Sequence, residues 1–246
     1  SNINNPIFRR FSENCPGTFQ HTLQVSNLAA EAANEIGAYA QLARTGALYH
    51  DIGKLDNPGF FTENQLAGDN PHDKMSYDSS ARIIIDHVSN GMRIAEKLGL
   101  PKAIKGFIYT HHGTSKTKYF YNSFMNENPD AKVDEANFTY PGPTPYSKET
   151  AIVMMADSVE ATSRSLPVYN EETITNMVNN IVNSQLAEGQ FNNAPITLKE
   201  IERVKNVFIN KLLTIHHSRI SYPKLKTEEE ERKKEVPEDE DSERRD

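Results

Sequence analysis

The chain lacks the features that mark several common classes of protein. Only one of its 246 residues, Cys15, is a cysteine. No internal disulfide can therefore form, and we expect a reducing compartment and an ordinary structural role for Cys15. No apolar run reaches the about 18 residues needed to cross a bilayer, so the chain as given is expected to be soluble. No convincing alternation of apolar and polar residues and no repeat is present, which disfavours a β-sheet fold.

An excess of positive charge is also lacking, although the acidity is not spread evenly. The formal net charge is -7, and residues 227–246 alone hold 11 acidic and 5 basic residues. Residues 1–226 are therefore nearly neutral, with a net charge of -1. The sequence predicts no basic groove for polymeric nucleic acid. The acidic run is typical of a solvated extension.

Changes in composition divide the chain into three parts. Residues 1–17 are interpreted as a lead-in, residues 18–217 as one folded domain and residues 218–246 as a charged tail. Pro6, Pro16 and Gly17 lead us to expect irregular structure from residue 2 to residue 19. Ser1 and Asn2 look like a tag remnant on a trimmed fragment, so flanking domains are expected to be missing.

Most of the chain shows apolar residues at steps of three and four, the spacing of helices that pack on a core. We expect helices over residues 18–36, 38–50, 76–98, 101–111, 148–165, 170–186 and 197–215. Thr18 is the expected N-cap of the first helix. Residues 55–74 and 114–147 contain many prolines and glycines and are long enough to suggest functional loops. The predicted fold class is all-α, a helical bundle with long active-site loops.

The stretch that organises this interpretation is the doublet of His50 and Asp51, followed by Gly53 and Lys54. Adjacent residues lie about 100° apart on a helix, so the two side chains can share one direction only if the helix ends there. We expect Gly53 to supply that ending. Imidazole and carboxylate are both good ligands for a divalent metal, and a carboxylate has two oxygens with which to bridge two ions.

Other histidines and an aspartate interrupt predicted apolar stripes or lie at helix ends: His21, His87, His111, His112 and Asp157. A single buried histidine is more often a satisfied core residue than a metal ligand. Several such groups, each losing about 1–3 kcal/mol if left without a hydrogen bond, are better explained by a shared metal centre. A structural all-α domain without a stoichiometric metal stays the simplest alternative.

The order of these residues resembles the H…HD…D signature of the HD-domain metal-dependent phosphohydrolases, with the extra histidines of its two-metal branch. Further stretches resemble the cytoplasmic HD domain of bacterial seven-transmembrane HD receptors, a subgroup that includes phosphodiesterases of cyclic di-AMP. They are PGTFQH at residues 16–21, YHDIGK at 49–54, ENQ at 63–65, NPHDK at 70–74, HHGT at 111–114 and YPGP at 140–143. The resemblance covers about residues 5–213.

The resemblance implies two divalent metal ions, iron or manganese, and the roles of their ligands. His21, His50, Asp51 and Asp157 would hold one ion, and Asp51 would bridge to a second ion held by His87, His111 and His112. An attacking hydroxide between the ions would then open a cyclic dinucleotide to a linear one. Asp51 and Lys54 are the catalytic candidates. Lys54 would contact the phosphate or protonate a leaving group, and its alternative is a solvated lysine.

Contacts to the substrate are assigned more loosely. His72 and Lys74 lie in a predicted loop and are candidates for phosphate contact, with a plain turn as the alternative. Tyr119 and Tyr121, near Lys116 and Lys118, have the composition of a base-stacking wall, with core packing as the alternative. The doublet of His216 and His217 is expected to be structural or solvated, beyond the end of the last helix.

Cyclic di-AMP hydrolysis has several alternatives. His112 is followed by Gly113 and Thr114 rather than by the Gly-Tyr-Pro motif of the HD-GYP branch, so cyclic di-GMP is less favoured. A non-hydrolytic regulatory module that binds cyclic dinucleotides, an HD-type phosphohydrolase of another nucleotide and an HD-fold di-iron oxygenase are the alternatives. The resemblance further implies the cytoplasmic domain of an integral inner-membrane protein, and the sequence leaves a homodimer open.

Overall fold

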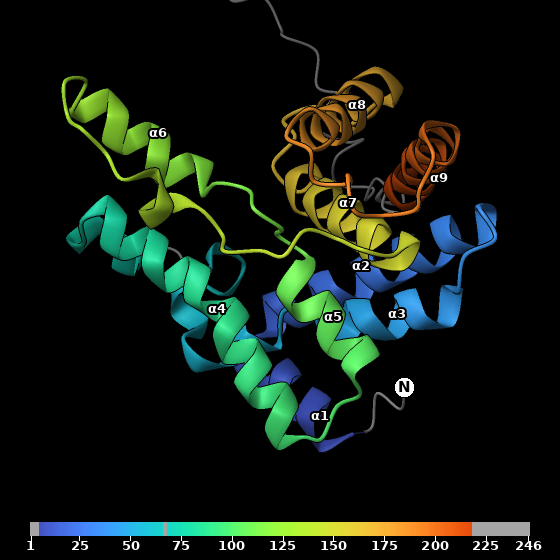
Figure 1. Cartoon of the computed structure of the whole chain (residues 1–246), viewed down its shortest axis with the longest axis horizontal. Helices are drawn as coiled ribbons and strands as arrows, with labels where there is room; N and C mark the ends of the chain where they lie inside the picture. Colours follow the sequence, from blue (N-terminus) through green and yellow to red (C-terminus); the bar gives the residue numbers. More distant parts are fainter. Residues whose placement is uncertain (1–4, 66–67, 218–246) are drawn as a thin grey trace, which may run out of the picture.

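The computed structural model describes residues 5–65 and 68–217 (Figure 1). The predicted charged tail, residues 218–246, lies outside the described residues. The described part contains helices and no named strand, which confirms the all-α prediction. The α-helices are α1 (Pro6–Asn14), α2 (Pro16–Glu35), α3 (Ala40–Tyr49), α4 (Tyr77–Lys97), α5 (Lys102–Thr110), α6 (Lys118–Glu127), α7 (Lys148–Ser163), α8 (Glu171–Ala187) and α9 (Leu198–His217).

The first predicted loop consists mainly of short 3-10 turns rather than of irregular chain. These turns are η1 (Ile52–Asp56), η2 (Pro58–Phe60), η3 (Thr62–Asn64) and η4 (Pro71–Lys74), and a fifth, η5 (Glu135–Phe138), follows α6. Pro58 and Pro71 each stand at the start of a turn, where the fixed φ of proline is already suitable.

The N-terminal residues differ from the expectation of irregular structure. Asn5 caps α1, because its side chain accepts a hydrogen bond from the main-chain N–H of Ile7 at 3.1 Å. Pro6 and Pro16 stand at the first helical positions of α1 and α2, where a missing N–H does no harm. Thr18 is consequently not the N-cap of α2. At both positions proline begins a helix rather than breaking one.

Two more predicted boundaries are wrong. Residues 114–147 were expected to be irregular, but they contain α6, which lies beside α4 at one side of the molecule (Figure 1). Its Phe124 packs against Phe138 of η5, with ring centroids 5.6 Å apart, so aromatic contacts stabilise a helix that the sequence pattern did not reveal. Helix α9 runs through His217, so the second histidine doublet belongs to the helix and does not follow it.

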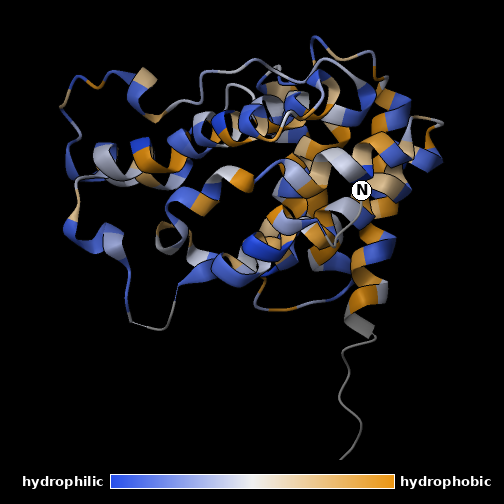
Figure 2. Ribbon diagram, turned by 90° about the horizontal axis from the view of Figure 1, so that it is seen from below, coloured by the Kyte–Doolittle hydropathy of each residue, from blue (hydrophilic) through white to orange (hydrophobic). Residues whose placement is uncertain are grey.

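Two apolar clusters form the core, and apolar residues gather where the helices pack together (Figure 2). The larger cluster joins α2, α3, α7, α8 and α9, and the smaller one joins α1, the end of α3, η1, the end of α4 and α5. Helices α3 and α5 pack closely, since a Cβ atom added at Gly46 would lie 2.2 Å from the ring of Phe107. The predicted metal ligands come from α2, α4 and α7 and from the ends of α3 and α5.

Candidate metal centre

The doublet of His50 and Asp51 lies where α3 ends. Tyr49 is the last residue of α3, His50 keeps a helical backbone as the C-cap, and Asp51 leaves the helix with φ -105° and ψ 12°. Both side chains are buried. The helix therefore ends at the doublet, as predicted, but Gly53 does not cause the ending. Gly53 lies against α4, and a Cβ atom there would be 1.8 Å from the main-chain oxygen of His87.

One group of four side chains brings its ligand atoms together on the α2 and α7 side of Asp51. These atoms, from His21, His50, Asp51 and Asp157, lie within 4.8 Å of one another. His21 Nε2 is 2.8 Å from Asp157 Oδ1. His50 Nε2 lies 3.4 Å from Asp51 Oδ2 and 3.4 Å from Asp157 Oδ1. This is the set that the resemblance assigned to one ion.

A second group forms on the α4 and α5 side and shares Asp51 with the first. It consists of Asp51, His87, His111 and His112, again with ligand atoms within 4.8 Å of one another. Asp51 Oδ1 lies 3.3 Å from His87 Nε2 and 3.5 Å from His111 Nε2, whereas its Oδ2 faces His50. The two oxygens of one carboxylate thus face two different sets of histidines, the arrangement needed for a bridging ligand.

The hydrogen bonds of these histidines turn Nε2 toward the ligand groups. In each of four imidazoles the Nδ1 atom lies beside an acceptor outside the two ligand groups, so Nε2 is the atom that would face a metal ion. The pairs are His50 with the main-chain oxygen of Ala47 at 2.6 Å, His111 with that of Ile108 at 2.8 Å, His87 with that of Ile84, and His21 with the Glu160 carboxylate.

Several of these atoms are buried without any hydrogen-bond partner. They are His50 Nε2 and both carboxylate oxygens of Asp51, of which Oδ2 has only an ion pair with Lys54 Nζ at 2.9 Å. In addition, the Nε2 atoms of His87 and His111 face each other at 3.1 Å, although their Nδ1 atoms carry the protons. Unpaired buried polar groups destabilise a protein by about 1–3 kcal/mol each. Divalent cations would satisfy these nitrogen and oxygen atoms together, so the donor set fits two ions.

The electrostatics of the first group also favour positive charge. Burial alone would lower the pKa of His21, but hydrogen bonds to Asp157 and Glu160 outweigh burial and raise this pKa to about 9. Burial acts likewise on His50, where the charges of Asp51 and Asp157 outweigh it and raise the pKa to about 10. The carboxylates that stabilise these imidazolium ions would equally stabilise a metal cation in place of the protons.

Lys54 lies directly beside this centre. Its Nζ atom is 2.9 Å from Asp51 Oδ2 and 2.8 Å from Glu63 Oε1, and its side chain is only 13% exposed. The alternative of a solvated lysine is therefore wrong. Glu63 also accepts a hydrogen bond from the Thr18 hydroxyl at 2.8 Å, so the ENQ segment ties α2 to the lysine.

Two cavities flank the ligand groups and share His112, Ser158 and Thr162 in their linings. The larger, of about 730 Å³, is also lined by His21, Lys54 and Asp157. The smaller, of about 420 Å³, is lined in addition by His111, Tyr119 and Tyr140. The ring of Tyr140 stacks on His112 with centroids 4.2 Å apart.

The four predicted substrate contacts, His72, Lys74, Tyr119 and Tyr121, differ in whether they line a cavity. Tyr119 lines the smaller cavity, and together with His72 it lines a third one, of about 510 Å³. The ring of His72 is held by a hydrogen bond from Nε2 to the main-chain oxygen of Phe60 at 2.9 Å. Lys74 is exposed, and Tyr121 donates its hydroxyl to Glu135 at 3.0 Å. Neither lines the two cavities beside the ligand groups, so their substrate roles stay predictions.

One residue in contact with the centre was absent from the predicted set. Glu160 meets His21 on the side opposite to Asp157. The sequence contained a usable signal, because residues three apart share a helix face and Glu160 follows Asp157 by three positions within a predicted helix.

The helical fold and the two adjoining ligand groups are those of a domain of the HD type. A family model for the HD domain matches residues 18–162. The chain therefore belongs to the HD domain family, whose members are metal-dependent.

Similar proteins agree with this assignment. The chain is 42% identical over 223 residues to the cyclic-di-AMP phosphodiesterase PgpH of Bacillus subtilis and 40% identical over 223 residues to that of Listeria monocytogenes. These alignments cover 91% of this chain and 31% of each relative. The chain thus spans about a third of the length of the curated relatives it matches. Among the described residues, no helix is both long and apolar enough to cross a membrane.

A solved structure extends the likeness to three dimensions. The HD domain of L. monocytogenes PgpH in complex with cyclic di-AMP superposes with a TM-score of 0.83 at 39% sequence identity. The match covers 89% of this chain and 100% of the solved one. The fold of the two chains is therefore the same over nearly all of the described residues.

Proposed function

We propose that this chain hydrolyses cyclic di-AMP to a linear dinucleotide at a centre of two divalent metal ions. One observation carries the proposal: the two oxygens of Asp51 face two separate sets of ligand atoms, one with His50 and the other with His87 and His111. Support for the substrate comes from the relatives named as cyclic-di-AMP phosphodiesterases and from the neighbour in complex with cyclic di-AMP.

The two ligand groups would hold iron or manganese, with Asp51 as the shared ligand. His21, His50 and Asp157 would complete one site, and His87, His111 and His112 the other. Ions bound in such a pair supply Lewis acidity, which neutralises a phosphodiester and activates a water for in-line attack. The protein fixes the geometry, because main-chain carbonyls or a carboxylate orient four of the imidazoles.

Lys54 would provide fixed positive charge at the phosphate rather than a proton. It lines the larger cavity together with His21 and Asp157. Burial alone would lower the pKa of Lys54, but the charges of Asp51 and Glu63 outweigh burial and raise the pKa above its usual value. An ammonium group held in this way stays protonated at neutral pH, so we assign Lys54 to phosphate binding and not to protonation of the leaving group.

The cavities suit a ligand with two bases on one phosphate-containing ring. Cavities of about 730 Å³ and 420 Å³ meet at His112, Ser158 and Thr162. A phosphodiester held at the ligand groups could place one base on each side. Tyr119 would contact the base in the smaller cavity, where apolar side chains such as Ile84 and Ile181 also line the wall. The substrate contacts predicted for His72, Lys74 and Tyr121 stay predictions.

The decisive experiment measures metal content and turnover in the same preparation. We expect protein purified without chelator to bind about two ions of iron or manganese and to convert cyclic di-AMP to the linear dinucleotide faster than it converts cyclic di-GMP. His87→Ala should reduce the content to about one ion and abolish turnover. Loaded protein that converts neither cyclic dinucleotide would overturn the proposal. Tight binding without conversion would then favour a regulatory module.

The setting of the domain in a longer protein is part of the same proposal. Because the relatives are about three times longer than the matched region, we propose that the chain is one domain of a longer protein. The resemblance to the seven-transmembrane HD receptors would make it the cytoplasmic domain of an inner-membrane protein. A homodimer stays a prediction, which sedimentation of the isolated domain would test.

A further inference from the structure

Glu160 lies behind the first ligand group, in the last turn of α7. Its side chain is only 7% exposed, and its Oε2 accepts a hydrogen bond from His21 Nδ1. On the other side of the same ring, His21 Nε2 lies 2.8 Å from Asp157 Oδ1. Two carboxylates one helical turn apart therefore hold the imidazole by its two nitrogens.

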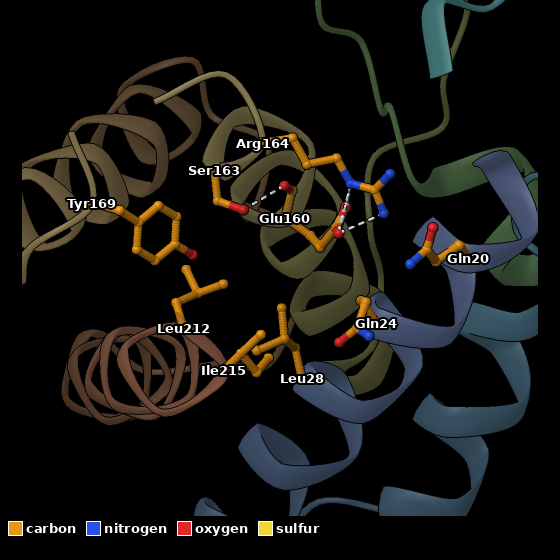
Figure 3. A pocket seen from close by; sticks show the side chains of 9 residues that line it. All are labelled: Gln20, Gln24, Leu28, Glu160, Ser163, Arg164, Tyr169, Leu212 and Ile215. Carbon is orange, nitrogen blue, oxygen red and sulfur yellow. Dashed lines mark hydrogen bonds and ion pairs between the residues drawn. The ribbon is translucent and has the colours of Figure 1, made fainter. Parts of the chain in front are cut away.

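Arg164 holds the Glu160 carboxylate in place. Its Nη2 lies 2.7 Å from Oε1, and its Nε lies 2.8 Å from Oε1 and 3.0 Å from Oε2. Figure 3 shows the guanidinium reaching back to this carboxylate beside a cavity of about 200 Å³. A carboxylate near a helix C-terminus is disfavoured by the helix dipole, and a buried one is disfavoured by desolvation. The arginine offsets both effects.

This arrangement distinguishes His21 from three other histidines of the centre. His50, His87 and His111 donate from Nδ1 to main-chain oxygens of their own helices. His21 instead donates to a side chain that carries a full negative charge. A charged acceptor on Nδ1 makes Nε2 a stronger metal ligand than a neutral carbonyl does. Only at His21, among these four, can a point substitution remove the acceptor.

We propose that Glu160, fixed by Arg164, is a positioning residue that orients His21 and strengthens its Nε2 as a ligand for one of the two ions. The proposal rests on the proposed metal centre and assigns a role to two residues outside its ligand sets. Glu160 is not a ligand itself, because it meets the ring of His21 on the Nδ1 side. The two groups of ligand atoms found among the described residues do not include it.

The experiment compares three variants with the wild-type chain. Glu160→Ala removes the acceptor, Glu160→Gln keeps an acceptor oxygen but removes the charge, and Arg164→Gln removes the cation that fixes the carboxylate. Ser163→Ala is the matched control. Ser163 lines the same cavity, and its hydroxyl donates to the main-chain oxygen of Glu160 at 2.7 Å without touching the carboxylate.

The readout is the affinity for each ion, obtained from metal content after equilibration with graded chelator. We expect Glu160→Ala to lower the affinity for one of the two ions about 10-fold to 100-fold, which is the usual effect of removing the hydrogen-bond partner of a metal ligand. Glu160→Gln should lower the affinity for the same ion by a smaller factor, and Arg164→Gln should lower it by about 10-fold or less. The affinity for the other ion should stay unchanged. Ser163→Ala should bind both ions with wild-type affinity. Thermal unfolding of the metal-free proteins identifies any variant that fails to fold, and Glu160→Gln then decides.

The outcomes separate this inference from the proposed function. If the wild type binds two ions and both Glu160 variants bind them as tightly, the positioning role is wrong and the metal centre stands. An equal decrease in the affinity for both ions, or a decrease that Ser163→Ala reproduces, would show that the ion pair of Glu160 with Arg164 is merely structural. Either result would also overturn the positioning role. A wild-type chain that binds fewer than two ions would instead overturn the binuclear centre itself.

Discussion

Gly53 lies where η1 crosses α4, and we expect Gly53→Ala to disturb both folding and the metal centre. A Cβ atom at this position would lie 1.8 Å from the main-chain oxygen of His87 and 2.5 Å from the main-chain nitrogen of Gly91. Carbon and oxygen atoms in close non-bonded contact lie about 3.3 Å apart, so η1 would have to move away from α4 by roughly 1.5 Å. Both contacted atoms belong to the backbone of a 21-residue helix, which cannot turn aside as a side chain does.

The size of the effect follows from this contact and from the position of Asp51. Overpacking usually destabilises a protein by about 1–3 kcal/mol, and a clash with backbone should reach the upper end, about 3 kcal/mol. For a domain of this size, 1 kcal/mol lowers Tm by about 2–4 °C, so we expect a decrease of about 6–12 °C. Asp51 precedes Gly53 by two residues, and its Oδ1 lies 3.3 Å from His87 Nε2. The same displacement should therefore weaken the ion of the second group.

The assay is thermal unfolding of chelator-treated protein, followed by elemental analysis after metal is restored. Gly59→Ala is the matched control, because no atom lies within 4 Å of a Cβ atom added there, and its Tm should stay within about 2 °C of the wild type. If Gly53→Ala unfolds at the same temperature as this control and binds both ions equally well, the close approach of η1 to α4 does not hold the centre together.

Three further predictions concern charge and protonation. Lys54→Met should destabilise the metal-free protein by up to roughly 3 kcal/mol, because it removes the ammonium 2.9 Å from the buried Asp51 carboxylate and leaves only histidines beside it. Unfolding in urea should show a smaller loss when metal is bound. Metal affinity should decrease as the pH is lowered below about 9, because protons compete for His21 and His50, whose pKa values are raised to about 9 and about 10. Calorimetry in buffers of different ionisation enthalpy should detect the release of protons when metal binds. Binding without proton release would contradict the assignment of these two histidines as metal ligands. Cys15 should resist thiol reagents at pH 8 in the native protein and react fully in denaturant, since burial raises its pKa to about 12.

The sequence could place the candidate ligands because its signals are local. Apolar spacing placed His21, His87 and Asp157 on buried helix faces, and each doublet marked a helix end. The resemblance then divided the ligands into two sets, and the geometry brings the same two sets together. The sequence could not show why position 53 needs a glycine. That reason is the close approach of η1 to α4, a helix that begins more than twenty residues later in the chain.

The errors have the same physical origin. Proline at residues 6 and 16 can break a helix or begin one, and only the packing of Phe8 and Phe11 in the smaller core cluster decides in favour of α1. Helix α6 likewise depends on contacts with α4 and η5. Tertiary contacts of this kind leave no periodic pattern in a short segment, so the regions around the ends and loops were the least predictable.

The ends of α3 and α5 explain how two pairs of adjacent residues can each contribute two side chains to the candidate centre. His50 and His111 are the C-caps of these helices, and each donates from Nδ1 to a main-chain oxygen of the last turn, which lacks an intrahelical partner. The chain then leaves the helix, so Asp51 and His112 can turn toward the same centre as the residues before them. The backbone stays helical through His216 and His217. We infer that two adjacent side chains can both face one centre where the chain leaves the helix between them.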